Sequence, residues 1–327
     1  MENTIDRFEN RIDTTELYES LKAVRASVSK TVKGQRQMID LLLTALLANG
    51  HVLIEGVPGV AKTLTAKVLA AHISGNYKRV QFTPDLMPSD VIGTSVFNAQ
   101  KNIFEFRRGP VFGNIVLVDE INRAPAKTQS SLFEVMEERQ ITYDGTTYPM
   151  DEPFMVLATQ NPVEQEGTYP LPEAQLDRFL FKINVDYPEA EDEFEILKAN
   201  NGQQKIWKPE EIETLLDAAQ IAHFRELTHQ VIVKDEIMQY ILQVIRGTRT
   251  CGELYLGASP RAGVALLAAS KAWAILQGRD FVTPDDVASM AIHVLGHRII
   301  LTAEKEMEGE KPHRVLERII KTVEVPR

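Results

Sequence analysis

Short apolar runs alternate with stretches of helical spacing through the first 190 residues. The run at 52–54 has the length and composition of a strand buried on both faces, and 115–118 is another apolar strand. Residues 79–83, 154–159 and 179–185 are further strand candidates. Helical spacing of apolar residues is found at 15–32, 36–48 and 127–138, and from Leu64 towards Gly75. Strands that alternate with helices predict a parallel sheet covered on both faces.

Two β-hairpins interrupt this alternation. Residues 94–97 and 103–106 flank the polar turn 98–102, and residues 141–143 and 146–148 flank Asp144-Gly145. Asp-Gly between two strand-like runs is a strong signal for a two-residue hairpin turn.

After Tyr187-Pro188 the pattern changes to helices with almost no strand. We expect helices at 189–200, 209–223, 234–249, 260–277, 284–299 and 312–323. Pro209, Pro260 and Pro284 suit the first position of three of them. The sequence therefore predicts a polar arm at 1–18, an α/β core at 19–190 and a smaller helical domain at 191–327.

The segment that joins the first core strand to its helix has the pattern of a phosphate-binding loop. It comprises Gly56, Val57, Pro58, Gly59, Val60, Ala61, Lys62 and Thr63, and Leu64 opens the helix. Such a loop directs backbone N–H groups and a helix N-terminus at phosphates. Lys62 would reach the β- and γ-phosphates, and Thr63 would bind Mg²⁺. Ala61 replaces the usual second glycine, so a simple glycine turn with an incidental lysine remains an alternative.

Polar residues follow the next predicted strands. Asp119 would hold Mg²⁺ through water, and Glu120 would orient or deprotonate a water that attacks the γ-phosphate. Asn161 could hydrogen-bond the phosphate or the water. Because open α/β sheets bind ligands at the carboxyl ends of their strands, these residues can converge with Lys62. The alternatives are acidic residues that simply follow a strand, and an ordinary Asn-Pro turn.

Two arginines complete the candidate set. Arg178 precedes the last core strand, and Arg261 opens a helix of the second domain. An arginine that reaches a transferring phosphoryl group stabilises its charge. The alternative for each is a solvated surface charge.

The order of these motifs resembles the MoxR family of AAA+ ATPases, in the clade with an insert in its second core helix. The matching stretches lie between about 20 and 300: GVPGVAKT (56–63), VDEINRAP (118–125), LFEVMEERQIT (132–142), ATQNP (158–162), LPEAQLDRF (171–179) and GASPRA (257–262). The resemblance implies an α/β P-loop core, with a parallel five-stranded sheet between helices, followed by a smaller all-α lid domain.

The resemblance also assigns roles residue by residue. Lys62 and Thr63 correspond to Walker A, and Asp119 and Glu120 to Walker B. Asn161 corresponds to sensor 1, Arg178 to the arginine finger and Arg261 to sensor 2. Val32 and Gly34 match the family's adenine contact. The implied ligands are ATP and Mg²⁺.

Family membership further implies a homo-oligomeric ring, usually a hexamer, with ATP bound between subunits. Known members act as chaperone-like motors in maturation or metal insertion, often beside a protein with a von Willebrand factor A domain. The client protein is not identified by the sequence.

Composition narrows the cellular context. Among 327 residues the formal net charge is −10, which argues against a broad nucleic-acid or membrane footprint. The single cysteine, Cys251, fits a reducing cytoplasm, and the polar N-terminus does not resemble a signal peptide. No apolar run suggests membrane insertion. His293 and His297 have the spacing of a metal pair, but they lack an evident third ligand, so ordinary helix residues are favoured.

Three functions follow from these features. The first is an ATP-hydrolysing, ring-forming remodelling enzyme. The second is a nucleotide-gated scaffold that turns over little ATP, and the third is a nucleic-acid motor, which the net charge disfavours.

Overall fold

The computed structural model describes residues 11–162, 167–201 and 212–326, except for the side chain of Asn200. The chain divides into two compact units. One runs from Val24 to Ala222, and the other combines the chain before Val24 with the chain from His223 onward. Each unit is described by itself below.

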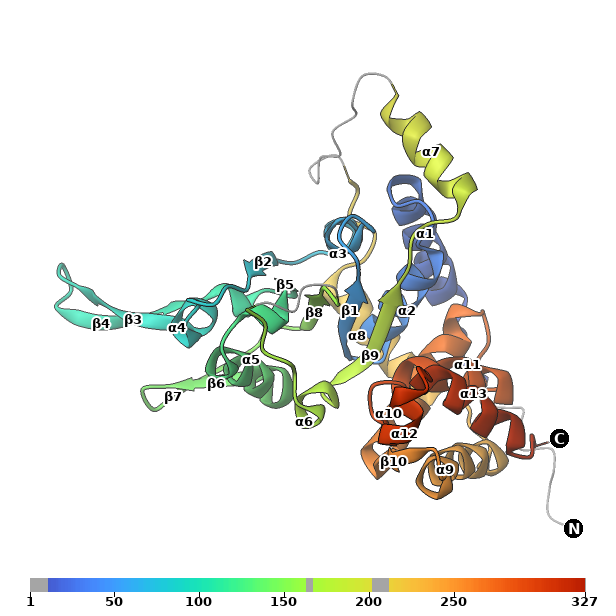
Figure 1. Cartoon of the computed structure of the whole chain (residues 1–327). Helices are drawn as coiled ribbons and strands as arrows, with labels where there is room; N and C mark the ends of the chain where they lie inside the picture. The colour runs from blue at the N-terminus through green and yellow to red at the C-terminus, as the bar shows by residue number, and fades with distance from the viewer. Residues whose placement is uncertain (1–10, 163–166, 202–211, 327) are drawn as a thin grey trace, which may run out of the picture. The chain divides into compact units, whose positions relative to one another are not determined.

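The α/β unit is built on a five-stranded sheet. Its strand order is β2 (Tyr77–Gln81), β5 (Ile115–Asp119), β8 (Met155–Gln160), β1 (His51–Gly56) and β9 (Phe179–Val185). Every neighbouring pair is parallel. The predicted parallel five-stranded sheet is therefore confirmed (Figure 1).

Side chains of successive residues in β5 point to opposite faces of this sheet. Val116 and Val118 belong to an apolar cluster with Leu132 and Phe133 of α5 (Ala126–Glu138). Asp119 has the opposite parity and contacts α3 (Lys62–Ala71), which packs against β2, β5 and β8. Helix α2 (Arg36–Leu47) is almost wholly buried and contacts β1 and β9. Both faces of the sheet are thus covered, as its continuous apolar strands require.

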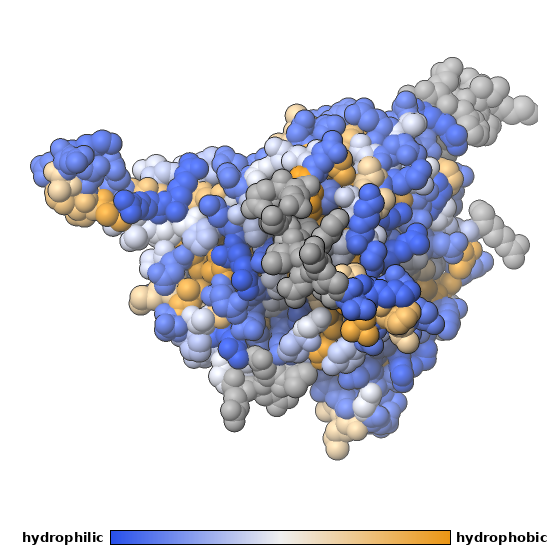
Figure 2. Space-filling view, turned by 90° about the horizontal axis from the view of Figure 1, so that it is seen from above, coloured by the Kyte–Doolittle hydropathy of each residue, from blue (hydrophilic) through white to orange (hydrophobic). Residues whose placement is uncertain are grey.

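Both predicted hairpins form in the α/β unit. They are β3 (Gly93–Asn98) with β4 (Ile103–Arg108), and β6 (Gln140–Tyr143) with β7 (Thr146–Pro149). The β3–β4 hairpin extends away from the sheet in Figure 1, and Figure 2 shows apolar surface along it. Its exposed apolar residues are Val96, Phe97, Ile103 and Phe104.

Short elements connect the strands of this unit. They are α4 (Pro88–Ile92), the 3₁₀ turns η1 (Pro110–Phe112) and η2 (Ile121–Arg123), and α6 (Glu173–Leu176). Helix α7 (Ala190–Asn200) follows β9, the last strand. Helix α1 (Thr15–Thr31) begins before the division between the units and ends after it.

The C-terminal part is helical, as the sequence predicts. Its helices are α8 (Ala218–Gln230), α9 (Asp235–Thr250), α10 (Pro260–Leu276), α11 (Pro284–Leu295), α12 (Ala303–Met307) and α13 (Pro312–Thr322). The short strands β10 (Leu254–Leu256) and β11 (Ile300–Leu301) pair antiparallel. Ser259 and Thr283 cap α10 and α11, directly before the prolines expected to open them.

Three predicted helix limits are wrong, one of them the end of the helix expected at 209–223, which continues to Gln230. The helix expected at 209–223 begins only at Ala218, because the Leu215 and Leu216 amides donate to the carbonyl of His72 instead. Residues 209–211 lie outside the described residues. The helix expected at 284–299 ends at Leu295, since the chain turns at Gly296 and continues into β11.

The domain boundary expected from the sequence differs from the boundary between the two compact units. The sequence suggests a division at 190/191, whereas Val24–Ala222 forms one compact unit. The chain after α7 packs against the α/β unit again, where Leu216 forms an isolated parallel β-bridge with Ile73. None of the described helices is long and apolar enough to cross a membrane.

Candidate functional site

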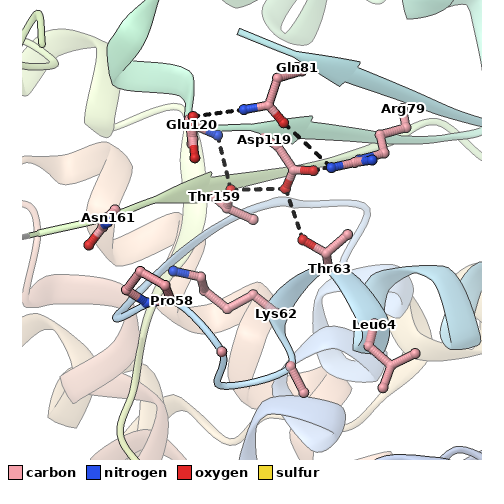
Figure 3. Close-up of a pocket in the computed structure, with 12 residues that line it drawn as sticks. Pro58, Lys62, Thr63, Leu64, Arg79, Gln81, Asp119, Glu120, Thr159 and Asn161 are labelled. Atoms are coloured by element: carbon pink, nitrogen blue, oxygen red, sulfur yellow. Dashed lines mark hydrogen bonds and ion pairs between the residues drawn. The ribbon is translucent and has the colours of Figure 1, made fainter. Parts of the chain in front are cut away.

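One cavity in the α/β unit gathers most of the predicted chemistry (Figure 3). It has a volume of about 370 Å³ and lies at the carboxyl ends of β1, β5 and β8. This is the edge at which open parallel sheets bind ligands. Its lining residues are Pro58, Gly59, Ala61, Lys62, Thr63, Leu64, Arg79, Gln81, Asp119, Glu120, Thr159 and Asn161.

The loop between β1 and α3 has a backbone that favours glycine. Gly59 has φ +90°, and Ala61 has φ +63°. The left-handed region costs an L-residue roughly 1–2 kcal/mol, so Ala61 tolerates a strain that glycine would avoid. The Lys62 ammonium donates to the carbonyls of Gly56 and Gln160, the latter at 3.4 Å. The lysine is therefore held at the mouth of the loop by backbone oxygens.

Asp119 is buried, and its carboxylate is contacted by side chains from α3, β2 and β8. Its Oδ1 accepts hydrogen bonds from the hydroxyls of Thr63 and Thr159, each at 3.1 Å. Its Oδ2 accepts one from Arg79 Nε at 2.7 Å. A polar side chain buried this deeply is costly unless hydrogen bonds replace its contacts with water, and these three donors supply them.

Glu120 follows immediately and turns out of the strand. Its φ of +57° lies in the left-handed region, and its N–H donates to Thr159 Oγ1 at 3.0 Å. Its Oε2 accepts from Gln81 Nε2 at 2.7 Å and lies 3.4 Å from Arg123 Nε. Because the backbone turns at Glu120, the carboxylates of Asp119 and Glu120 point in different directions, and both residues line the cavity.

The donors at this edge fit a magnesium ion delivered with a nucleotide. The Thr63 hydroxyl and an Asp119 oxygen lie 3.1 Å apart, and both are hard oxygen donors. The described residues contain no group of three or more His, Cys, Asp or Glu side chains that could hold a metal. Mg²⁺ commonly binds through one or two protein oxygens together with substrate phosphates. When bound, the ion would neutralise charge on the phosphate oxygens.

The remaining predicted residues lie at different places. Asn161 is buried and lines the cavity. Arg178 is not among the cavity's lining residues; it lies 3.5 Å from Glu137 on α5. Val32 is buried at the end of α1, and Gly34 has φ +72° in the α1–α2 connection. Arg261 is an exposed residue in the first turn of α10, in the other unit.

Three residues of the site were not singled out from the sequence: Arg79, Gln81 and Thr159. Arg79 and Gln81 alternate with the core residue Val80 on β2. That alternation is visible in the sequence as polar residues on one face of a strand. Their partners depend on β2 lying beside β5, and the sequence does not give the strand order.

Zinc binding by His293 and His297 finds no support. Among the described residues, neither histidine belongs to a group of three or more side chains that could hold a metal. His293 lies in α11 and burial lowers its pKa, whereas the buried His297 lies just beyond the end of that helix, so the expectation that both are helix residues is wrong for His297.

Comparison with known proteins identifies relatives of the whole chain. Residues 51–181 match the ATPase family associated with various cellular activities, and residues 246–319 match the AAA lid domain. The chain is 43% identical to Chaperone MoxR1 of Mycobacterium tuberculosis, over 91% of this chain and 80% of that protein. It is 30% identical to Protein MoxR of Methylorubrum extorquens, over 86% and 87% of the two chains.

Two further relatives cover nearly the full length. Protein YeaC of Bacillus subtilis is 46% identical over 91% of this chain and 92% of its own. A crystal structure of a protein described as an ATPase, from Cytophaga hutchinsonii, superimposes with a TM-score of 0.88 and 41% identity. The match covers 96% of this chain and 97% of that one.

Proposed function

This chain belongs to the MoxR family of AAA+ ATPases, and we propose that it binds Mg-ATP in the cavity at Lys62 and hydrolyses it to remodel a partner protein. One observation carries the proposal. Lys62, Asp119 and Asn161 follow three neighbouring strands and line one cavity at the sheet edge where such folds bind ligands.

The chemistry proposed is in-line attack of water on the γ-phosphate. Lys62 would leave its carbonyl partners for the β- and γ-phosphates, with which it makes charge-assisted contacts. Thr63 and Asp119 would hold the magnesium, Asp119 through water. Glu120 would orient the attacking water and accept its proton, and Asn161 would hydrogen-bond the water or the phosphate.

The remaining nucleotide contacts are proposed from the family correspondence. The loop residues from Gly56 to Leu64 would surround the phosphates, and Val32 and Gly34 would contact adenine. Arg261 would act as sensor 2. Arg178 would supply positive charge to the ATP of a neighbouring subunit, which agrees with its absence from the cavity lining of its own chain.

We further propose that the chain assembles into a ring, a hexamer as is usual in the family, that works on a client protein in the cytoplasm. The relative named Chaperone MoxR1 supports a remodelling role. A partner with a von Willebrand factor A domain and a task in maturation or metal insertion are part of this proposal. We propose neither a nucleic-acid substrate nor membrane insertion.

Nucleotide titration with phosphate-release kinetics tests the proposal. Lys62→Ala should lose most affinity for fluorescent ATP, whereas Lys78→Ala, an exposed lysine of β2 outside this cavity, should not. Glu120→Gln should bind ATP normally and hydrolyse it slowly. Glu134→Gln, an exposed glutamate of α5, is its matched control. Wild-type binding by Lys62→Ala or wild-type turnover by Glu120→Gln would refute these roles.

The same measurements separate the enzyme from a nucleotide-gated scaffold. A scaffold would bind ATP with the same dependence on Lys62 but would release little phosphate even when assembled. Salt-dependent binding to single- and double-stranded DNA would instead support a nucleic-acid motor.

A further inference from the structure

Strand β2 presents a polar face to the magnesium-binding edge of the site. It pairs in parallel register with β5, so that Gln81 lies beside Asp119 and Arg79 lies beside Leu117. Arg79 and Gln81 share the face that carries Asp119, whereas Lys78 and Val80 have the opposite parity. Figure 3 shows the Arg79 and Gln81 side chains directed at the two carboxylates.

Arg79 supplies the positive charge that meets Asp119 in this structure. The guanidinium Nε lies 2.7 Å from Asp119 Oδ2, and a second nitrogen lies 3.5 Å from Gln81 Oε1. Only 6% of the Asp119 side chain is exposed, against 46% of the Arg79 side chain. A buried carboxylate requires a counter-ion, and Lys62 is held by backbone carbonyls in this structure.

Both carboxylate oxygens of Asp119 already accept hydrogen bonds, which leaves little room for a metal to bind them. Its Oδ1 already accepts two hydroxyls, one of them from the other proposed metal ligand, Thr63. Its Oδ2 accepts a hydrogen bond from the Arg79 guanidinium. Magnesium, or a magnesium-bound water, that approaches this carboxylate meets a cation already hydrogen-bonded to it, and like charges in a half-buried site repel.

We propose that Arg79 is the resident counter-ion of Asp119 and competes with magnesium for this carboxylate. The guanidinium holds Asp119 while the metal is absent, and Mg²⁺ entering with the nucleotide displaces it towards the exposed rim of the cavity. Arg79 is thus a positioning residue that raises the magnesium concentration the site needs. This inference rests on the proposed nucleotide binding.

A merely structural role for Arg79 predicts the opposite change in magnesium binding when the arginine is removed. If the guanidinium orients Asp119 for the metal and remains in place, removing it should weaken magnesium binding. If it competes, removing it should strengthen magnesium binding. The direction of the change therefore separates the two roles without reference to catalytic rate.

The experiment measures how magnesium promotes binding of fluorescent ADP to the full chain. ADP is titrated at a series of free Mg²⁺ concentrations and in EDTA, with wild type, Arg79→Gln, Arg79→Met and Arg79→Lys. Arg79→Gln retains a hydrogen-bond donor for Oδ2 and removes only the charge, so it keeps the test open if Arg79→Met fails to fold. Lys78→Gln removes the same charge from the opposite face of the same strand.

We expect the half-saturating Mg²⁺ concentration to fall about 5- to 10-fold in Arg79→Gln and Arg79→Met, the lower end of the usual coupling between two sites. Arg79→Lys and Lys78→Gln should stay near wild type. An unchanged or higher Mg²⁺ requirement in folded Arg79→Gln overturns the inference and leaves the proposed function intact. Failure of wild type to bind ADP at any Mg²⁺ concentration overturns both.

Discussion

Gln81 donates its side-chain amide to the carboxylate of Glu120, with Nε2 and Oε2 2.7 Å apart. Glu120 has left-handed backbone angles, and its N–H is held by Thr159. The edge strand β2 therefore fixes the direction of the carboxylate that we propose as the base. One oxygen is occupied by Gln81, which leaves Oε1 as the natural acceptor for a water proton.

Replacing Gln81 should slow hydrolysis without weakening nucleotide binding. Gln81→Leu removes the hydrogen bond to a charged acceptor, worth about 1.5–3 kcal/mol when fully formed, and lets Glu120 sample other directions. We expect kcat to fall about 10-fold and KM to change little, measured by phosphate release. Gln140→Leu, at an exposed position of β6, is the control. A rise in kcat would mean that the bond instead restrains Glu120 from its task.

The sheet and the loop were predictable because they depend on local patterns. Five strand-like runs gave the five strands, and the segment before Lys62 forms the expected loop between β1 and α3. Ala61 was the weak point of that prediction. The structure shows that alanine adopts the left-handed angles that glycine normally provides, so the motif tolerates this change at a modest cost in strain.

The partners of the carboxylates were not predictable, because they depend on strand order. Arg79 and Gln81 reach Asp119 and Glu120 only because β2 lies beside β5 in a particular register. Helix limits failed for a similar reason. Leu215 and Leu216 donate to His72, a tertiary contact that replaces the start of the expected helix.

The two hairpins should respond together to nucleotide. The Phe106 ring of β4 stacks on Tyr143 and Tyr148 of the other hairpin, with centroids 4.7 and 4.8 Å apart. The β6–β7 hairpin in turn joins α5 to β8, which ends at the cavity. We expect hydrogen exchange in both hairpins to change when a slowly hydrolysed ATP analogue binds. Unchanged protection in both, with rings assembled, would contradict a role in the nucleotide response.

Removing the stacked ring should uncouple the hairpins. Aromatic pairs are worth about 0.5–1.5 kcal/mol each, so losing the two stacks in Phe106→Ala should open the base of β3–β4 roughly 5- to 150-fold more often. Hydrogen exchange reports this as faster exchange in the hairpin, with the sheet unaffected. Phe104→Ala removes an exposed ring from the same strand and is the control. Equal effects of the two changes would show that the stack does not connect the hairpins.

Acid should destabilise the helical unit through His293. Burial lowers the pKa of this histidine below its ordinary value of 6.5. Below pH 6.5 the unfolded chain therefore binds a proton that the folded chain does not, so stability is present above this pH and is lost as pH falls towards the lowered pKa. His293→Gln should reduce the drop in melting temperature between pH 7.5 and about 5.5. His313→Gln, on α13, is the control; an unchanged drop in His293→Gln would contradict the assignment.

Arg178 decides whether neighbouring subunits share one active site. It lies directly before β9, within 3.5 Å of Glu137, and about a third of its side chain is exposed. It does not line the cavity that holds Lys62 and Glu120. Because the guanidinium is partly exposed and does not line the cavity of its own chain, we propose that it acts on the nucleotide of a second copy of the chain.

Mixing two inactive variants tests this arrangement. Arg178→Ala should bind ATP normally but lose activity, by as much as about 10³- to 10⁵-fold if its charge meets the γ-phosphate. Lys62→Ala should fail to bind ATP. Rings assembled from both contain junctions that pair an intact loop with an intact arginine, so phosphate release should partly return. Its absence, after exchange of labelled subunits is verified, would exclude action across the interface; full activity of Arg178→Ala alone would exclude any catalytic role.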